Sequence, residues 1–238
     1  MNNTERVRPE NILFLDIETV GAVVDYQRLD PRMKPLWDKK AETIRKSPED
    51  TPEKCYEKAG IYAEFGKIIC ISVAFLKEGT LRIKSFASDN EIALLQDFAA
   101  LLNAYFCKPH HRLCAHNGKE FDFPYLCRRM LINKIPLPAI LDAAGKKPWE
   151  TQFLDTMELW RFGDYKNYTS LDLLAAVFDI PSPKDDINGS MVHQIYWESG
   201  DIQRIATYCE KDVLTIVQLY LCYCGLDLLT EDKIVFVK

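Results

Sequence analysis

The sequence predicts an α/β fold in which a mixed five-stranded sheet carries helices on both faces. Two strand-like segments joined by a short turn, at 67–76 and 81–88, follow a first apolar strand. Beyond residue 90, helical and strand-like patterns alternate, and an antiparallel group followed by such alternation is typical of a mixed sheet. Of the 238 residues, 47% are hydrophobic, which is enough for a sizeable core. No internal repeat or linker is evident, so we expect one domain over residues 1–238.

The first half of the chain contains three predicted strands and an insertion. Residues 11–19, NILFLDIET, form an apolar run typical of a buried strand. Residues 20–66 are rich in Pro and in charges of both signs, so we expect an irregular, partly helical insertion with a helix from Asp50 onwards. The segments KIICISVAFL and LRIKSFAS flank the turn KEGT and are expected to pair as an antiparallel hairpin.

The second half of the chain is expected to alternate between helices and strands. Apolar residues recur at helical spacing in EIALLQDFAALLNAYF, and Ser88 with Glu91 matches a capping box. The final helix is predicted to begin after an N-cap at Asp201 and to stop at Gly225. We expect strands near 112–117 and 153–160, and helices at 91–106, 121–134, 169–178 and 202–224.

Composition argues against several classes of protein. No run of about 18 apolar residues is present and the N-terminal MNNTERVRPE is polar, so we expect no membrane segment and a cytoplasmic location. The eight cysteines lie mostly in apolar segments and are expected to be reduced core thiols. The segment CKPHHRLC lacks the second ligand pair of a structural zinc site, so a surface turn is expected there. The formal charge of −5 argues against nonspecific coating of nucleic acid.

Two acids interrupt the first strand. Side chains alternate between the faces of a strand, so Asp16 and Glu18 project from the same side, roughly 6 to 7 Å apart. Two like charges in an apolar strand repel each other and are costly to desolvate. Either these carboxyl groups titrate, or a cation lies between them.

Two further acids raise the same question in other elements. Asp212 lies in the apolar stripe of the last helix, with Tyr208 one turn earlier on the same side. Asp122 lies at a strand-to-helix junction after a Gly-containing turn, where helix capping is an equally good explanation. A mixed sheet could bring all four carboxylates to one edge. Mg²⁺ and Mn²⁺ prefer oxygen ligands, and a pair of such ions about 4 Å apart is a recurring arrangement for phosphodiester hydrolysis.

The three acidic segments match a known set of motifs. Asp16-Ile17-Glu18 is a D-x-E signature, residues 117–122 (NGKEFD) match Asn-x₃-Phe-Asp, and residues 208–212 (YCEKD) match Tyr-x₃-Asp. In this order the motifs resemble those of the DEDD 3′-5′ exonucleases, which have a ribonuclease H-like fold. The tyrosine four residues before Asp212 is similar to the DEDDy branch, because the histidine branch would need His where this chain has Thr207.

A longer resemblance runs from about residue 10 to 224. The segments DIET, FGKIICISVAFL, HNGKEFDFPYLCRRM, LDTMELWRFGDYKNYTSLDLLAAVFDIPSPKDDINGS and YCEKDV resemble stand-alone exonucleases related to the proofreading domain of family B DNA polymerases. The resemblance implies catalytic roles for Asp16, Glu18, Asp122, Tyr208 and Asp212. The four acids would hold two Mg²⁺ or Mn²⁺ ions, with Asp16 bridging them, and Tyr208 would orient the attacking water. The alternative for Tyr208 is a half-buried aromatic on an amphipathic helix.

Substrate contacts are expected near the same residues. Asn117 could hydrogen-bond a ligand or hold its own turn, and Phe121 flanks Asp122. In WRFGDYKNY (160–168), Lys166 and Tyr168 could hold phosphates and stack bases, unless these aromatics are simply core. Asp155 could be a supporting acid or part of a local turn.

The function expected from these features is a metal-dependent 3′-5′ exonuclease that removes nucleoside 5′-monophosphates from the 3′ end of single-stranded DNA by a two-metal mechanism. Two alternatives stay open: a 3′-5′ exoribonuclease of the same branch, and a catalytically silent nucleic-acid-binding module. The sequence does not identify protein partners.

Overall fold

The computed structural model describes residues 7–181 and 187–237, and its described part contains one six-stranded mixed sheet. The strand order is β5-β4-β1-β2-β3-β6. β1 pairs antiparallel with β2 and parallel with β4, so the expected mixed α/β sheet is confirmed. The strands are β1 Ile12–Gly21, β2 Gly66–Lys77, β3 Thr80–Ala87, β4 Arg112–Ala115, β5 Phe153–Asp155 and β6 Ile234–Phe236.

The prediction of five strands is wrong by one. β6 pairs parallel with β3 at the edge of the sheet, and the Val237 amide continues the pairing by donating to the Ile83 carbonyl at 2.7 Å. Three residues are too few for a period-two pattern to be recognised in sequence. β5 is also shorter than the predicted 153–160, because the Asp155 side chain accepts from the Met157 and Glu158 amides and starts a helix at Thr156.

The β2–β3 hairpin forms as the sequence predicts. Lys77 pairs with Thr80 across the two-residue turn. Both turn residues have positive φ, 54° at Glu78 and 77° at Gly79, as a type I′ turn requires. The other edge of β2 pairs with β1, so the hairpin extends the sheet outward from β1.

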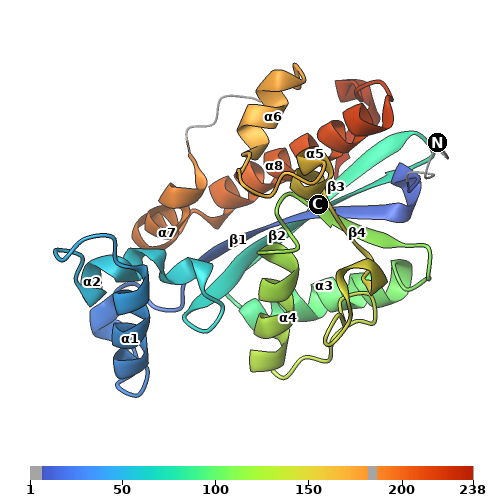
Figure 1. Cartoon of the computed structure of the whole chain (residues 1–238). Helices are drawn as coiled ribbons and strands as arrows, with labels where there is room; N and C mark the ends of the chain where they lie inside the picture. The colour runs from blue at the N-terminus through green and yellow to red at the C-terminus, as the bar shows by residue number, and fades with distance from the viewer. Residues whose placement is uncertain (1–6, 182–186, 238) are drawn as a thin grey trace.

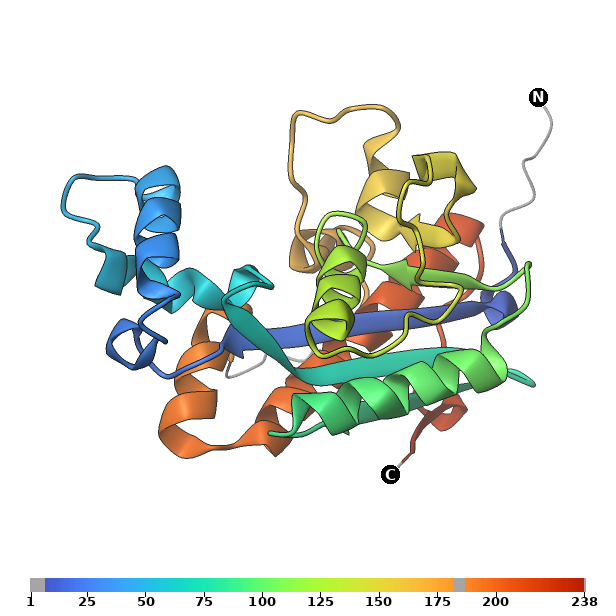
Figure 2. The same ribbon diagram turned by 90° about the horizontal axis from the view of Figure 1, so that it is seen from below.

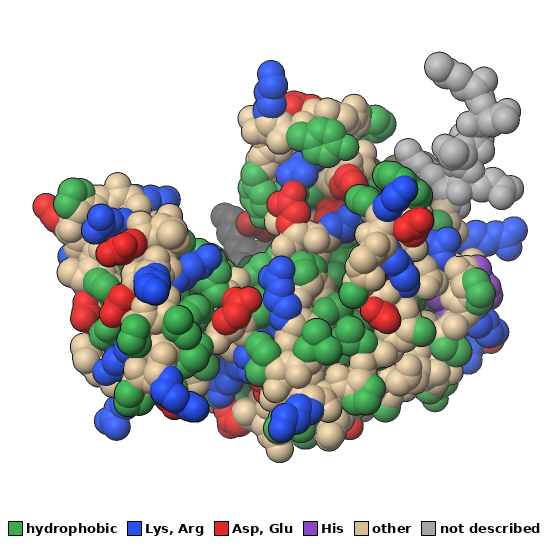
Figure 3. All heavy atoms as spheres, turned by 60° about the horizontal axis from the view of Figure 1, so that its bottom comes forward, with side chains coloured by type: hydrophobic (Ala, Val, Ile, Leu, Met, Phe, Trp, Pro, Cys, Tyr) green, Lys and Arg blue, Asp and Glu red, His purple; other side chains and the backbone are tan. Residues whose placement is uncertain are grey.

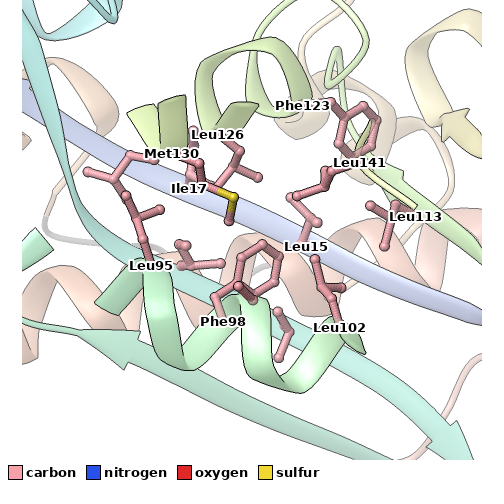
Figure 4. Close-up of a cluster of buried hydrophobic side chains, with 14 of the residues drawn as sticks. Leu15, Ile17, Leu95, Phe98, Leu102, Leu113, Phe123, Leu126, Met130 and Leu141 are labelled. Atoms are coloured by element: carbon pink, nitrogen blue, oxygen red, sulfur yellow. The ribbon is translucent and has the colours of Figure 1, made fainter. Parts of the chain in front are cut away.

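Helices cover both faces of the sheet (Figures 1 and 2). On one face, α3 and α4 pack against β1 side chains such as Leu15 and Ile17 (Figure 4). On the other face, α8 packs against Ile12 and Phe14. The helices are α1 Lys34–Ile44, α2 Pro52–Cys55, α3 Glu91–Tyr105, α4 Asp122–Ile132, α5 Thr156–Arg161, α6 Leu171–Val177, α7 Val192–Gln194 and α8 Ile202–Cys224. α8 begins after the predicted Asp201 N-cap and ends at Gly225 in the left-handed conformation.

The insertion at 20–66 forms a lobe that projects beyond the end of β1 (Figure 1). Its main helix is α1, which the sequence analysis did not identify, whereas the helix expected from Asp50 onwards is only α2 followed by a 3₁₀ segment. Trp37 is fully buried and donates from Nε1 to the Pro52 carbonyl at 2.8 Å. Tyr125 on α4 donates to the Gly60 carbonyl at 2.7 Å and so ties the lobe to the sheet core.

The predicted capping box at Ser88 and Glu91 is wrong. Asn90 is the N-cap of α3 and accepts from the Ala93 amide at 3.1 Å. The Glu91 side chain is instead buried, where it accepts from the Ile68 amide and from Arg129 Nε, both at 2.8 Å. A tertiary ion pair has displaced the local cap.

We expect Arg129→Ala to lower the free energy of unfolding by about 3 kcal/mol, because it leaves the buried Glu91 carboxylate without its cation. It also removes a hydrogen bond of 2.8 Å to the Ala63 carbonyl. Urea denaturation measures the change. Arg128→Ala on the exposed side of the same helix is the control and should stay close to wild type. An equal loss in both variants would contradict the assigned role.

Candidate active site

Asp16 and Glu18 lie in the middle of β1 on the face that α8 covers. Asp16 pairs with Ser72 and Glu18 with Cys70 on β2. Glu18 is only 8% exposed. Alternation along the strand therefore directs both carboxylates into the interface between the sheet and α8.

Asp122 is contributed to the same site by a different element, α4. It is the first residue of α4 and is buried. The parallel pairing of β4 with β1 stops at Phe14, and beyond it the Ile17 amide lies close enough to the Asp122 carboxylate to lower its pKa. The helix-capping explanation is not what the structure shows, because the N-cap is Phe121 and its side chain makes no capping bond.

α8 supplies three groups. Tyr208 and Asp212 lie one turn apart, close enough that the charge of Asp212 adds to burial in raising the pKa of Tyr208. Between them, the Cys209 thiol is fully buried and donates to Asp16 Oδ2 at 3.4 Å. Ligand atoms of Asp16, Glu18 and Cys209 all lie within 4.8 Å of one another. The sequence predicts only an ordinary core thiol at Cys209, because nothing in its local pattern distinguishes it.

The pKa values show how closely the acids approach one another. The pKa of Asp16 is raised by burial and then by the charges of Asp122, Asp212 and Glu18, while the Cys209 hydrogen bond acts in the opposite direction. Burial and then Asp212 raise the pKa of Glu18. In the described part of the chain, no salt bridge involves Asp16, Glu18 or Asp122. The residues taken from the three motifs thus form one cluster of negative charge.

Asp122 is affected differently because two amides stabilise its charged form. Burial raises its pKa most strongly, its own amide and that of Ile17 lower it, and the charge of Asp155 raises it, which leaves the pKa at about 7. The carboxyl group is therefore half-protonated near neutral pH when no cation is bound.

Asp155 organises the turn that leads to Asp122. Its two carboxylate oxygens accept from the Asn117 and Lys119 amides, each at 3.0 Å, and one of them also accepts from the Met157 amide at 3.0 Å. Asn117 has a φ of 58°, and a Cβ on Gly118 would come within 2.4 Å of the Ala115 Cβ. This turn is thus held in one conformation by a buried acid and by the close packing of the Gly118 backbone against the Ala115 side chain.

We expect Asp155→Asn to lower turnover about tenfold and stability by about 1 to 2 kcal/mol. An amide can still accept at one oxygen, but its NH₂ group faces the Lys119 amide and so misaligns the turn before Asp122. Nuclease rate and thermal unfolding measure both effects. Asp25→Asn is the control, because Asp25 also accepts a backbone hydrogen bond, from Arg28, but is exposed. A normal rate in Asp155→Asn would exclude the positioning role.

The four expected substrate contacts are not equivalent. Asn117 Oδ1 is buried and has no hydrogen-bond partner among the described residues. Phe121 packs on Tyr125, with ring centroids 5.3 Å apart, and belongs to the core. Tyr168 is exposed, and it lies near enough to Asp122 that this charge adds to burial in raising its pKa. Lys166 is exposed in the loop beside it.

The aromatic segment 160–168 divides into two parts. Trp160 packs edge-on against Phe178 at 5.7 Å and belongs to the core beneath α6. Phe162, Tyr165 and Tyr168 are exposed on the surface. Packing in the core therefore holds for Trp160, whereas the exposed aromatics stay available for contact with nucleic acid.

No helix in residues 7–181 or 187–237 combines the length and apolar character needed to span a membrane.

The segment CKPHHRLC forms the expected turn into β4, where His111 Nδ1 accepts from the Lys108 amide at 3.3 Å.

Comparisons with known proteins agree with this architecture. A family model described as "Predicted 3′-5′ exonuclease related to the exonuclease domain of PolB" matches residues 61–233. This range contains Asp122, Tyr208 and Asp212, whereas Asp16 and Glu18 on β1 precede it. A comparison with curated proteins gives no match.

Among solved structures, the family B DNA polymerase from the hyperthermophilic archaeon Pyrobaculum calidifontis is similar, with a TM-score of 0.53 and 15% identity over 90% of this chain. The chain spans 25% of the length of that polymerase. At this identity the structural similarity is evidence for the fold alone. The shared fold confirms the expected ribonuclease H-like architecture.

Proposed function

This chain belongs to the family of predicted 3′-5′ exonucleases related to the exonuclease domain of PolB, and from that premise we propose that it is a single exonuclease domain acting on the 3′ end of single-stranded DNA. The reaction is metal-dependent hydrolysis of the terminal phosphodiester bond by a two-metal mechanism, with release of a nucleoside 5′-monophosphate. One observation carries the proposal. Asp16 and Glu18 on β1 share a buried site with Asp122 from α4, where the charge of Asp122 raises the pKa of both β1 acids and that of Glu18 raises the pKa of Asp16.

The donor set fits hard divalent cations. The carboxylates of Asp16, Glu18, Asp122 and Asp212 are oxygen ligands, and their mutual repulsion is the kind that a pair of Mg²⁺ or Mn²⁺ ions would neutralise. In this proposal all four acids hold the ions and Asp16 bridges them. When bound, the ions supply the positive charge that makes water a better nucleophile and stabilises the leaving 3′ oxygen.

Tyr208 orients the attacking water in this proposal. Its pKa is raised by burial and by the charges of Asp212 and Glu18, so the phenol keeps its proton near neutral pH. Its hydroxyl can therefore donate to one partner and accept from another, which is what positioning a water requires.

We expect Tyr208→Phe to lower turnover about a hundredfold while divalent-ion binding stays within about twofold of wild type. The substitution removes one oxygen and keeps the ring packing. Single-turnover kinetics and calorimetry measure the two quantities. Tyr105→Phe on the exposed side of α3 is the matched control. Unchanged turnover in Tyr208→Phe would contradict the role.

Three groups are proposed to contact the strand. The unpartnered Asn117 Oδ1 accepts a hydrogen bond from the terminal nucleotide, the Tyr168 ring stacks on a base, and Lys166 pairs with a phosphate. Phe121 acts indirectly in this proposal, by supporting the backbone before Asp122. On the face in Figure 3, Lys and Arg side chains are interspersed with acids and form no continuous basic patch. The formal charge of −5 for the whole chain likewise favours gripping one strand end over coating nucleic acid nonspecifically.

The direct test uses DNA oligonucleotides labelled at the 5′ end, incubated with Mg²⁺ or Mn²⁺. Wild type should shorten them stepwise from the 3′ end, whereas Asp16→Ala should not. A phosphorothioate at the 3′-terminal linkage should block wild type. Equal degradation by wild type and Asp16→Ala would reject the site assignment. An RNA oligonucleotide of the same sequence measures the sugar preference, and faster RNA degradation would replace DNA as the proposed substrate.

A further inference from the structure

Arg161 is a largely buried arginine at the end of α5, directly before the segment 162–168. Its side chain is only 13% exposed. Phe162 and Gly163 have positive φ, 45° and 92°, and the Asp164 amide donates to the Arg161 carbonyl at 2.8 Å. The chain therefore turns sharply after Arg161, and the exposed aromatic residues follow this turn.

The guanidinium group of Arg161 has no close oxygen acceptor. Its Nε is buried without a hydrogen-bond partner among the described residues, and its Nη2 donates only to the Met157 sulfur, at 3.8 Å. Nη1 forms an ion pair with Glu120 Oε1 at 3.6 Å, which is too long for a hydrogen bond. The centre of the Tyr165 ring lies 6.0 Å from Cζ. A group with five N–H donors is thus left with one weak ion pair.

Arg129 shows the partners of a buried arginine whose role is internal. Its side chain is 10% exposed, close to the value for Arg161. Its Nε donates to the Glu91 carboxylate and its Nη1 to the Ala63 carbonyl, both at 2.8 Å. Burying a charged group is costly unless it is paired and hydrogen-bonded. Packing therefore accounts for Arg129, but it leaves the donors of Arg161 without acceptors.

The part of Arg161 that a ligand can reach faces the turn before Asp122. Nε is buried, whereas Nη1 is directed at Glu120, whose side chain is 67% exposed. Glu120 lies two residues before Asp122. Burial is the main cause of the lowered pKa of His116, and the charge of Arg161 lowers it further, so the guanidinium also lies near the residue before Asn117. Arg161 is thus placed between the active-site turn and the aromatic segment.

We propose that Arg161 binds a phosphate of the nucleic-acid strand, a contact that rests on the proposed exonuclease function. Two N–H groups of a planar guanidinium match two oxygens of a phosphate. Glu120 holds Nη1 in the free protein, and the strand phosphate replaces it. Lys166 and Tyr168, which are proposed to contact the strand, follow in the same segment. The phosphate is common to DNA and RNA, so the contact does not depend on the sugar.

The test is equilibrium binding of the full chain to single-stranded DNA with a 5′ fluorescent label and a 3′-terminal phosphorothioate, measured by anisotropy with Mg²⁺. We expect Arg161→Gln to weaken binding about tenfold. The slope of log affinity against log salt should fall by about 0.7, the value for one phosphate contact on a single strand. The melting temperature should not fall, because no internal hydrogen bond to oxygen is lost.

Arg82→Gln is the matched control, because it removes the same charge from an exposed position on β3. It should change neither the affinity nor the salt slope. Glu120→Gln should act in the opposite direction and strengthen binding about twofold, because it removes the carboxylate that competes for Nη1. A neutral methylphosphonate, moved along the strand one linkage at a time, should weaken binding to wild type at one position and have no effect there on Arg161→Gln.

The outcomes separate this contact from the proposed function. Unchanged binding in Arg161→Gln, while wild type binds and shortens the strand, would overturn the contact and leave the exonuclease proposal in place. Weaker binding and a lower melting temperature in both Arg161→Gln and Glu120→Gln would overturn it in favour of a structural ion pair. Unchanged strand affinity with lost inhibition by a nucleoside 5′-monophosphate would overturn it in favour of a product site. A wild-type protein that neither binds nor shortens the strand would overturn both proposals.

Discussion

Replacing Asp16 by Asn is expected to lower exonuclease turnover at least about a thousandfold while making the metal-free protein more stable by about 1 to 3 kcal/mol. Burial and three other carboxylates all raise the pKa of Asp16. Removing its charge relieves that repulsion in the absence of metal. The same change removes the proposed bridging ligand, so the ions that neutralise the remaining acids bind less tightly.

A loss of turnover combined with a gain of stability in Asp16→Asn would distinguish a functional Asp16 from a structural one. Asn keeps the size of Asp and an oxygen that can accept from the Cys209 thiol. Turnover is measured on labelled oligonucleotide, and stability by urea denaturation in the presence of a chelator. Asp89→Asn, which removes an acid that accepts from Tyr196, is the control and should leave turnover unchanged. A variant that loses stability and activity together would indicate a structural Asp16.

The second large effect is the dependence of stability on pH and metal. An acid with a folded pKa above its unfolded pKa binds extra protons in the folded state, so its penalty is absent below the unfolded pKa and complete above the folded pKa. For Asp122 the range runs from 3.8 to about 7, which corresponds to about 4 kcal/mol. The raised pKa values of Asp16 and Glu18 add to the same trend.

The metal-free protein should therefore be more stable near pH 5 than near pH 8. Divalent ions bind the charged form, so Mn²⁺ at about a hundred times its dissociation constant should restore about 2.7 kcal/mol at the higher pH. Thermal unfolding at both pH values, with Mn²⁺ or with a chelator, measures the effect. The double variant Asp16→Asn/Asp122→Asn should show a flatter pH profile and little response to Mn²⁺. A wild-type protein that is more stable at pH 8 without metal would contradict the account.

The sequence was informative where a local pattern corresponds directly to geometry. Alternation in β1 predicts that Asp16 and Glu18 share a face, and the hairpin follows from the KEGT turn with its two positive φ values. The spacing of Tyr208 and Asp212 places both on one side of α8. These features depend on neighbours a few residues away.

The features that sequence analysis missed depend on contacts between distant segments. Glu91 does not form the predicted capping box, because its side chain accepts a hydrogen bond from Arg129, which is distant in sequence. β6 is a strand because the edge of β3 is available to it. Cys209 became a neighbour of Asp16 only through the packing of α8 on β1. The orphaned Asn117 oxygen and the Asp155 clamp likewise require the tertiary structure.

Carboxylates distant in sequence are proposed to form one divalent-ion site, and calorimetric titration with Mn²⁺ near pH 8 measures the occupancy of that site. Wild type should bind two ions per chain, and both Asp16→Asn and Asp212→Asn should lose at least one of them. Wild-type binding without any change in these variants, or no Mn²⁺ binding at all, would contradict the account.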